Sequence, residues 1–233
     1  MVKDYKPQLF KMQGFLDCNA YQALVAGVDP VVIQKVNAAI DKKVEFLDNI
    51  DNGDYPSILR HSFTDLSIAK FDVYTILTAM YEPRLGCYIL ITKSTDAFES
   101  KYPREHRAMK LFHCSAFFEI SENKTRYVTV GWMDMGLSKI PRLLEKLFFK
   151  KLIEMRADAT HKGFETGVAD MRKINWTPNK FEGGRSLLDT LDQFLKRHPE
   201  KDPNKKQEKV KVTRGTDVEE IEEVLITVES INA

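Results

Sequence analysis

The sequence predicts an α+β domain in which a curved antiparallel sheet packs on a long C-terminal helix. Between Tyr127 and Asp134 the side chains alternate between two faces, which is the period of a strand. Upstream, candidate strands follow one another through short turns, as in an antiparallel meander. From about Ile140 to His161, apolar residues recur at helical spacing and form a wide stripe, made of Leu144, Leu147, Phe148, Leu152 and Met155. A sheet closed by such a helix holds either a filled core or a core with a cavity.

The N-terminal third is predicted to mix strands with short helices. Asn19 is a favourable helix cap, and Pro30 suits the first turn of a second helix. A turn-rich stretch, Asp48–Asp54, separates two candidate strands. In chain order the expected elements are a strand in Lys6–Leu16, helices at Asn19–Gly27 and Val31–Ala39, and strands at Lys43–Leu47 and Ser57–Phe63.

The central third carries the clearest strand signals, because its segments are rich in β-branched and aromatic residues. The turn Glu82–Gly86 predicts a hairpin, and Glu122–Lys124 predicts a second tight turn. We expect strands at Phe71–Met80, Cys87–Lys93, Ala108–Ile120 and Tyr127–Met133.

Beyond Gly167 the composition changes. The next residues are rich in Pro, Gly and Asn, and Ser186–His198 has the apolar spacing of a short amphipathic helix. A basic linker, Pro199–Lys211, precedes an acidic segment, Asp217–Glu223, and an apolar run, Val224–Val228. We therefore predict a folded domain over residues 1–167 and an extension over residues 168–233.

Composition narrows the class of protein. The 233 residues are 43% hydrophobic and 10% aromatic, which is enough for a real core. The formal net charge of +1 lacks the broad positive charge of a nucleic-acid-binding protein. No apolar run approaches the ~20 residues of a membrane span, and the N-terminus lacks the apolar region of a secretory signal. Three scattered cysteines are expected to be reduced core thiols, which favours a cytoplasmic protein: Cys18, Cys87 and Cys114.

No catalytic or metal-binding pattern emerges. His106 and His113 precede Cys114 at a spacing that metal sites do not use, and the Gly183-Gly184 pair lacks the strand and lysine of a phosphate-binding loop. Asp134 ends a strand beside a turn, where capping is a commoner role than acid–base chemistry. We therefore expect a protein that is not an enzyme and that uses no cofactor or metal.

The predicted long helix has a basic face, and two interpretations of it stay open. Its side chains would contact anionic lipid head groups or would simply be solvated; they are Lys139, Arg142, Lys146, Lys150 and Lys151. The aromatic side chains of the sheet likewise fit either an ordinary core or the lining of an apolar ligand pocket.

From Phe71 to about His161 an ordered series of segments resembles a START (StAR-related lipid transfer) domain. The series is KFDVYTIL (Lys70–Leu77), RLGCYILITKS (Arg84–Ser94), KYPREHRAM (Lys101–Met109), HCSAFFEI (His113–Ile120) and TRYVTVGWMDMGLSKIP (Thr125–Pro141), followed by the helix. Upstream, Lys11–Asp29 resembles the family's strand-then-helix segment and Val44–Phe63 its next strands. The match covers about residues 8–165, and it rests on the order of the segments because no single motif is specific.

The sequence also departs from the family pattern. The first strand of the series starts Lys-Phe-Asp-Val rather than Arg-Asp-Phe-Val, and the family's Trp-Asp pair is absent near Pro30–Asn37. The family's N-terminal helix and first two strands have no room before Gln8, so we expect a divergent, shortened copy. The sterol-binding branch has a buried arginine, paired with an acid, on the strand that matches Val73–Met80. Val73–Leu77 carries no charge here, which argues against a sterol-type polar anchor.

The resemblance implies a helix-grip fold, in which the sheet wraps the C-terminal helix around a tunnel for one lipid. It implies that the protein binds the lipid without covalent chemistry and transfers or senses it at anionic membranes, to which it would be peripheral. Sterol, phospholipid and sphingolipid all stay open as ligands. Arg107 matches the arginine of the family's Arg-Ala pair and is expected in a structural salt bridge. Strand parity and matching family positions predict a tunnel lined by Thr75, Leu77, Tyr88, Leu90, Ala108, Lys110, Met135, Leu144, Phe148, Leu152 and Met155.

Two other classes of protein stay open. One is a non-enzymatic α+β interaction or scaffold domain, with its core filled by side chains and its C-terminal tail carrying partner contacts. The other is a helix-grip enzyme such as a cyclase or hydrolase, against which the lack of a clustered His/Asp/Glu set argues.

Overall fold

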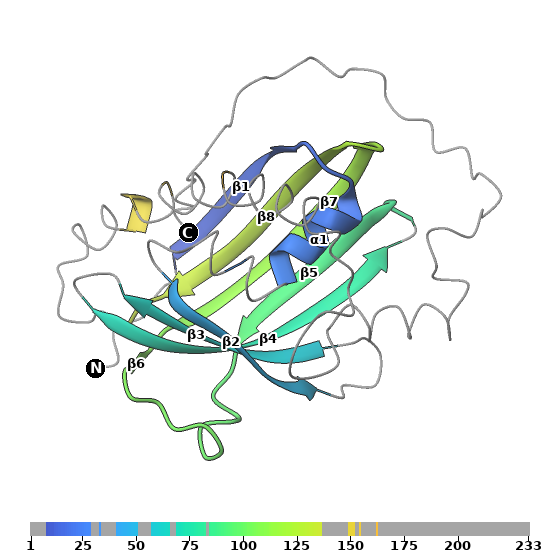
Figure 1. The fold of residues 1–233 in the computed structure, drawn as a ribbon. Helices are drawn as coiled ribbons and strands as arrows, with labels where there is room; N and C mark the ends of the chain where they lie inside the picture. Colours follow the sequence, from blue (N-terminus) through green and yellow to red (C-terminus); the bar gives the residue numbers. More distant parts are fainter. Residues whose placement is uncertain are drawn as a thin grey trace.

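The computed structural model describes residues 8–28, 33, 41–50, 57–65, 69–82, 84–136, 149–151, 154 and 162. Within these ranges the chain forms a sheet with a helix packed on it (Figure 1). The elements are β1 (Gln8–Leu16), α1 (Ala20–Val28), β2 (Asp41–Ile50), β3 (Ser57–Asp65), β4 (Lys70–Glu82), β5 (Cys87–Ser94), β6 (Arg107–Ala108), β7 (Lys110–Ser121) and β8 (Lys124–Asp134).

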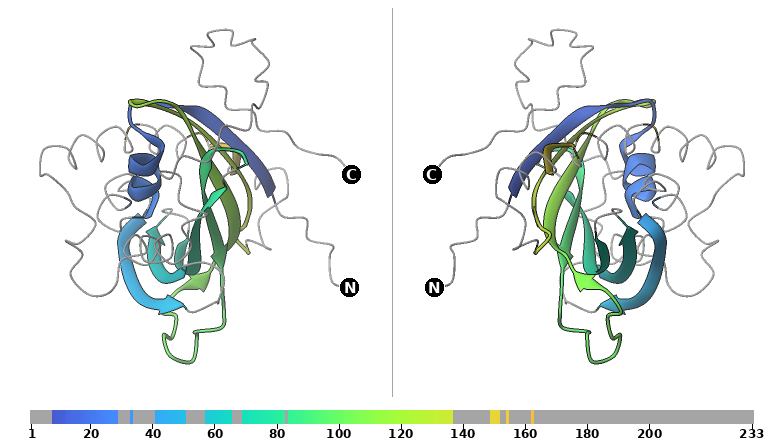
Figure 2. Two further views of the ribbon diagram at one scale, coloured as in Figure 1. Left: turned by 90° about the vertical axis from the view of Figure 1, so that its right-hand side faces the viewer. Right: turned by 90° about the vertical axis from the view of Figure 1, so that its left-hand side faces the viewer.

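The strands lie in one sheet in the order β1-β8-β7-β5-β4-β3-β2, and neighbours on this path are antiparallel. This confirms the predicted meander and adds that β1 returns to pair with the last strand. β6 lies off the path and pairs parallel with the start of β4. The sheet is strongly curved, and α1 lies on its concave side (Figure 2).

The helix α1 begins at the predicted cap. The Asn19 side chain accepts a hydrogen bond from the Gln22 backbone N–H at 2.8 Å, and the Gln22 side chain accepts one from the Asn19 N–H at 3.3 Å. Such reciprocal capping satisfies two donors that the first helical turn leaves open. Small residues then bring the helix close to β5, β7 and β8, because Ala20, Ala23 and Ala26 are buried.

Two glycines are required by the backbone of the sheet. Gly86 closes the β4–β5 turn with a φ of 62°, which other residues rarely adopt. In β8, a side chain at Gly131 would meet the Phe112 carbonyl oxygen at 2.4 Å. Gly131 therefore lets β8 and β7 approach closely where the sheet curves.

The predicted strands and the first helix are confirmed, with one correction. We expected one strand over Ala108–Ile120, but the chain breaks at Met109: β6 pairs with β4, and β7 starts at Lys110. Periodicity did not reveal the break because both pieces are rich in apolar residues. The expected helices at Val31–Ala39 and Ile140–His161, and the boundary at residue 167, lie largely or wholly outside the described residues. Of the described residues, none belongs to a helix long and apolar enough to cross a membrane.

Candidate functional site

The strand register divides the sheet into a concave inner face and a convex outer face. On the inner face, Tyr88 of β5 lies opposite Phe117 of β7, which lies opposite Tyr127 of β8. One row further along, Leu90, Ser115 and Thr129 are aligned in the same way. These side chains share the face that α1 covers, so the candidate site is the inner face.

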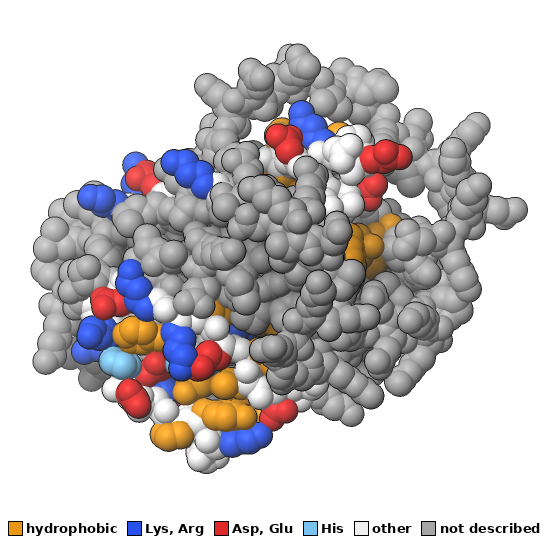
Figure 3. Space-filling model, viewed as in Figure 1, with side chains coloured by type: hydrophobic (Ala, Val, Ile, Leu, Met, Phe, Trp, Pro, Cys, Tyr) orange, Lys and Arg blue, Asp and Glu red, His pale blue; other side chains and the backbone are white. Residues whose placement is uncertain are grey.

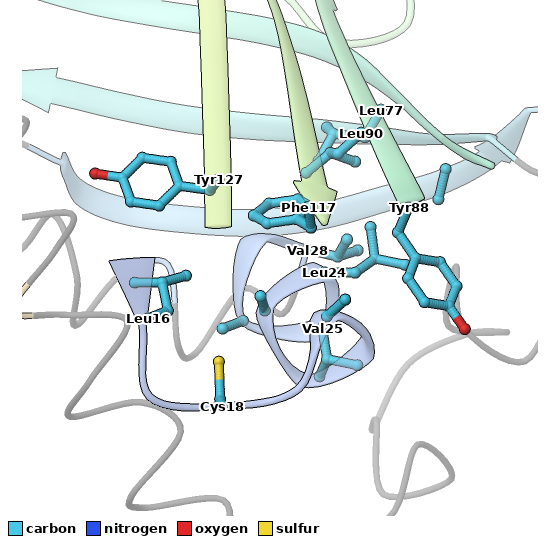
Figure 4. Close-up of a cluster of buried hydrophobic side chains, with 14 of the residues drawn as sticks. Leu16, Cys18, Leu24, Val25, Val28, Leu77, Tyr88, Leu90, Phe117 and Tyr127 are labelled. Atoms are coloured by element: carbon cyan, nitrogen blue, oxygen red, sulfur yellow. The ribbon is translucent and has the colours of Figure 1, made fainter. Parts of the chain in front are cut away.

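One end of the inner face is an apolar cluster beneath α1, which we call the helix-side cluster. Figure 4 shows Leu24 and Val28 of α1 lying against the ends of the strands that carry Phe117 and Tyr88. The Tyr88 ring also contacts Tyr21, with 5.7 Å between ring centroids, and Tyr81, with 5.0 Å. On the sheet, the buried members of the cluster are Leu16, Ile58, Leu77, Ala79, Tyr88, Leu90, Phe117 and Tyr127.

The other end is a second apolar cluster, which we call the far cluster. Its buried members are Phe71, Val73, Met109, Met133, Met135 and Phe149. Phe149, from the segment of the expected long helix, is 2% exposed and lies 6.5 Å from the Phe10 ring of β1. The far cluster therefore brings Phe149 against residues of β1, β4 and β8.

A belt of polar side chains lies between the two clusters, and we call it the inner polar belt. On β4, Thr75 separates Val73 of the far cluster from Leu77 of the helix-side cluster. On β8, Thr129 lies between Met133 and Tyr127 in the same manner. The belt comprises Arg60, Thr75, Thr92, Ser115 and Thr129, each no more than 9% exposed. Met12 packs against both apolar clusters, so the belt does not separate them completely.

The belt is hydrogen-bonded in part. The Ser115 and Thr129 hydroxyls are 2.8 Å apart, and the Thr75 hydroxyl donates to the Arg60 carbonyl oxygen over 3.4 Å. The Thr92 Oγ1 has no hydrogen-bond partner among the described residues, although the side chain is only 1% exposed. A buried hydroxyl left unsatisfied costs about 1–3 kcal/mol. This part of the interior therefore offers hydrogen-bonding capacity to a water molecule or to a polar group of a ligand.

On the outer side, the buried carboxylate of Asp72 holds the loop between β5 and β6 against the sheet. One of its oxygens accepts a hydrogen bond from His61 Nε2 at 3.0 Å. The other accepts from the backbone N–H groups of Glu105 and His106, at 2.9 and 2.7 Å, and lies 3.1 Å from His106 Nδ1. Burial by itself raises the pKa of Asp72. The hydrogen bonds from His61, His106 and Glu105 together lower the pKa by more than burial raises it, so the net shift is downward.

Further groups complete this cluster around Asp72. The Glu45 carboxylate lies 3.5 Å from the second ring nitrogen of His61, and the His61 ring stacks on Tyr74 with 4.9 Å between centroids. The Arg104 guanidinium lies over the Tyr74 ring, 5.3 Å from its centroid. It also forms an ion pair with Asp96 at 2.6 Å. In Figure 3, charged side chains of both signs and a histidine gather at the lower left of the molecule. The arrangement fixes the β5–β6 loop against the outer side of the sheet.

The structure brings several predicted lining residues together. Leu77, Tyr88 and Leu90 are buried in the helix-side cluster, Thr75 lies in the belt, and Met135 lies in the far cluster. Ala108 is half-buried in β6, where it pairs with Asp72. The predicted residues Leu144, Phe148, Leu152 and Met155 lie outside the described residues.

Lys110 is placed differently from its prediction. It lies opposite Asp134, one position out of phase with the inner-face row of Leu111 and Met133, and its side chain is 59% exposed. The break at Met109 interrupts the alternation of side chains between the two faces. Counting alternate residues from Ala108 therefore predicts the wrong face for Lys110.

Other predicted residues are placed as follows. Arg107 donates to the Gly136 carbonyl oxygen at 3.3 Å. The turn role of Asp134 is confirmed, because it accepts from the Gly136 N–H at 2.7 Å. Cys18 and Cys87 are buried free thiols, and Cys114 is half-buried. Of the basic helix face, Lys150 and Lys151 are described and exposed, while Lys139, Arg142 and Lys146 lie outside the described residues.

Sequence reasoning predicted Thr75 but missed the other members of the inner polar belt. Arg60 lies directly opposite Thr75, so a buried guanidinium stands beside the uncharged stretch that had argued against a polar anchor. In the structure, Ile58, Arg60 and Ser62 are all buried on one face of β3. An arginine in a strand is usually exposed, which hid this pattern.

Comparisons with known proteins agree on the fold. No protein-family model matches the sequence, and no curated protein matches it. Among solved structures, human STARD10 is 13% identical with a TM-score of 0.62, covering 87% of this chain and 76% of that one. The lipid transfer and protein localization domain of human StarD13 (DLC2) is 11% identical with a TM-score of 0.55, covering 72% and 81%. Human StAR-related lipid transfer protein 5 is 14% identical with a TM-score of 0.53, covering 70% and 76%.

These identities are too low to transfer a ligand or a role. The curved sheet, its strand order and the position of α1 nevertheless follow the order of segments on which the resemblance rested. The described part of this chain has the fold of a START domain.

Proposed function

We propose that the protein binds a single lipid between the inner sheet face and the helices, and transfers or senses it at membranes without covalent chemistry. The observation that carries this proposal is the inner polar belt, which lies between two apolar clusters. A core selected only for stability gains little from a buried arginine and an unsatisfied threonine hydroxyl. A lipid that carries a polar group between two apolar parts would place that group against the polar belt and its apolar parts against the two clusters.

The lining that we propose combines both ends of the inner face. Its described members are Thr75, Leu77, Tyr88, Leu90 and Met135, joined by Leu144, Phe148, Leu152 and Met155 of the C-terminal helix segment. Removing apolar surface from water yields about 25 cal/mol per Å². Most of the affinity would come from this term, while the polar belt would set the orientation of the lipid.

Delivery needs a membrane and a reversible opening. We propose that the basic helix face docks on an anionic leaflet through Lys139, Arg142, Lys146, Lys150 and Lys151, at about 1 kcal/mol for each basic side chain near the surface. The structural relatives whose names include lipid transfer support a lipid as the ligand. The lipid class is left open by this proposal.

A second candidate is a scaffold domain with a filled core. It is favoured by the large side chains that are fully buried in both clusters, such as Phe71, Phe117 and Phe149. In that case the polar belt would be bridged by internal water molecules, and no lipid would bind.

Native mass spectrometry of the purified protein separates the two candidates. Lipid binding predicts an added mass of several hundred daltons (the size of one lipid) and lipid uptake from vesicles. Leu90→Asp should abolish uptake, because it places a charge in the lining. Leu85→Asp is the matched control, since Leu85 is 62% exposed. A clean apo mass with no uptake, or undiminished uptake by folded Leu90→Asp protein, would contradict the proposal.

A further inference from the structure

The outer face of the sheet carries an exposed apolar surface that lipid binding does not use. Leu9 of β1 lies opposite Trp132 of β8, which lies opposite Phe112 of β7, and Val130 occupies the next outer row. Leu9 and Val130 are each 45% exposed. We define the outer apolar surface as Leu9, Phe15, Phe112, Phe118, Val130 and Trp132.

Basic side chains surround this surface. Lys11 lies opposite Val130, and Arg126 lies between Phe15 and Phe118. Lys124 is placed over the Phe15 ring, 5.2 Å from its centroid. With Lys93 and Lys110 they form a basic rim of exposed residues. The acidic residues nearest to it are Asp134, opposite Lys110, Glu119, opposite Thr125, and Asp96, whose carboxylate lies 3.8 Å from Lys110 Nζ. A partner with apolar and acidic groups would complement both features.

The same chain contains such a segment. Residues 217–229 read DVEEIEEVLITVE, with six acidic side chains and no basic one. At helical spacing, Val218, Ile221, Leu225 and Val228 fall on one stripe. Thr216 and Glu219 have the spacing of a helix-starting capping box. The segment thus combines an apolar stripe with the charge opposite to that of the rim.

We propose that residues 217–229 dock as an amphipathic helix on the outer apolar surface of their own chain, with their carboxylates facing the basic rim. The linker permits this. Even if Ser186–His198 is helical as predicted, the other residues of 163–216 would as a coil have an end-to-end distance of roughly 35 Å, whereas β1 is about 30 Å long. Tethering also gives the segment an effective concentration on the order of millimolar, which an untethered partner must exceed to displace it.

Cys114 provides a direct probe, because it lies on the outer face opposite Val130 and is half-buried. Cys18 and Cys87 are buried and serve as internal references in the same molecule. The experiment measures alkylation of each cysteine by the neutral reagent N-ethylmaleimide, using the full chain at constant pH and mass spectrometry of the peptides. The test variant reverses the charge of the segment: Glu219→Lys, Glu220→Lys, Glu222→Lys and Glu223→Lys.

Docking predicts that this variant exposes Cys114 and raises its alkylation rate about fivefold, the change expected if about 80% of molecules are docked beforehand. Reversing acids of the linker instead, with Glu200→Lys, Asp202→Lys and Glu208→Lys, should leave the rate unchanged. Adding Lys11→Glu and Arg126→Glu to the test variant should restore slow alkylation.

Three results would overturn the proposal. One is a Cys114 rate that the test variant does not change. The second is protection that appears only with anionic vesicles, which would assign the surface to a membrane. The third is protection that increases with protein concentration, which would assign it to a second copy of the chain.

Discussion

At the scale of single residues, the hydroxyl groups of the inner polar belt differ in how they are satisfied. Ser115 and Thr129 are hydrogen-bonded to each other at 2.8 Å, whereas Thr92 Oγ1 has no partner among the described residues. Two substitutions of identical shape therefore have opposite expected effects. This contrast tests whether the hydroxyl groups of the belt serve only to stabilise the fold or are also available to bind a polar group of a ligand.

Thr92→Val should raise the free energy of unfolding of the lipid-free protein by about 1 kcal/mol, because it removes an unsatisfied buried hydroxyl. Thr129→Val should lower it by about 1 kcal/mol, because it leaves Ser115 without its partner. Urea unfolding followed by circular dichroism measures both values. A loss of stability in Thr92→Val would mean that an ordered water already satisfies the hydroxyl.

Asp72 makes the protein sensitive to acid. Its hydrogen bonds with His61, His106 and Glu105 hold its pKa below the ordinary value of 3.8. A depressed pKa contributes stability that is fully present above the unfolded value and is lost as the pH falls through the folded value. Asp72→Asn should cost about 2 kcal/mol at pH 7, since hydrogen bonds to a charged group are lost. The difference from the unsubstituted protein should shrink below about pH 4. Urea titrations at several pH values check this, and a gap that stays constant with pH would contradict it.

Residue roles were predictable from the sequence where strands are uninterrupted. Leu77, Tyr88 and Leu90 lie in β4 and β5, whose alternation is continuous, and the structure places them on one buried face. Lys110 was misplaced because the break at Met109 restarts the alternation. Arg60 was missed because a single residue's charge says nothing of the sheet geometry that buries it.

At the scale of elements, α1 depends on its N-terminal cap. The reciprocal hydrogen bonds between Asn19 and Gln22 start the helix, and buried alanines let it lie close to the sheet. The cap and the small residues were both visible in the sequence, so this helix was predicted with its boundary. The pairing of β6 with β4 was not, because a two-residue strand has no periodicity to detect.

Asn19→Ala should lower the free energy of unfolding by about 1 kcal/mol, the usual loss when a helix cap is removed. Since α1 covers the helix-side cluster, the same change should weaken lipid uptake. Asn49→Ala is the control, because Asn49 is exposed in β2. Equal stability of the two variants in urea unfolding would show that the cap contributes nothing.

At the scale of the whole molecule, near-neutral net charge conceals a division of charge along the chain. The formal net charge is +1, yet residues 217–229 carry six acidic side chains and no basic one, and the predicted face of the long helix is basic. The sequence alone revealed both segments. It did not reveal the basic rim, because Lys11, Lys93 and Arg126 come from three strands that only the sheet register brings together.

The helix face and the lipid-binding interior should therefore be separable by mutation. Lys150 and Lys151 are exposed, and each basic side chain near an anionic leaflet contributes about 1 kcal/mol. Lys150→Glu with Lys151→Glu should slow lipid transfer to anionic vesicles about tenfold or more, while the lipid content of the purified protein stays unchanged. Lys70→Glu with Arg84→Glu changes the net charge equally at exposed positions elsewhere. Transfer assays in low and high salt should show a salt dependence that the first pair loses and the second keeps, because screening acts on docking and not on the buried apolar contacts. If both pairs slow transfer equally, net charge matters and the helix face has no special role.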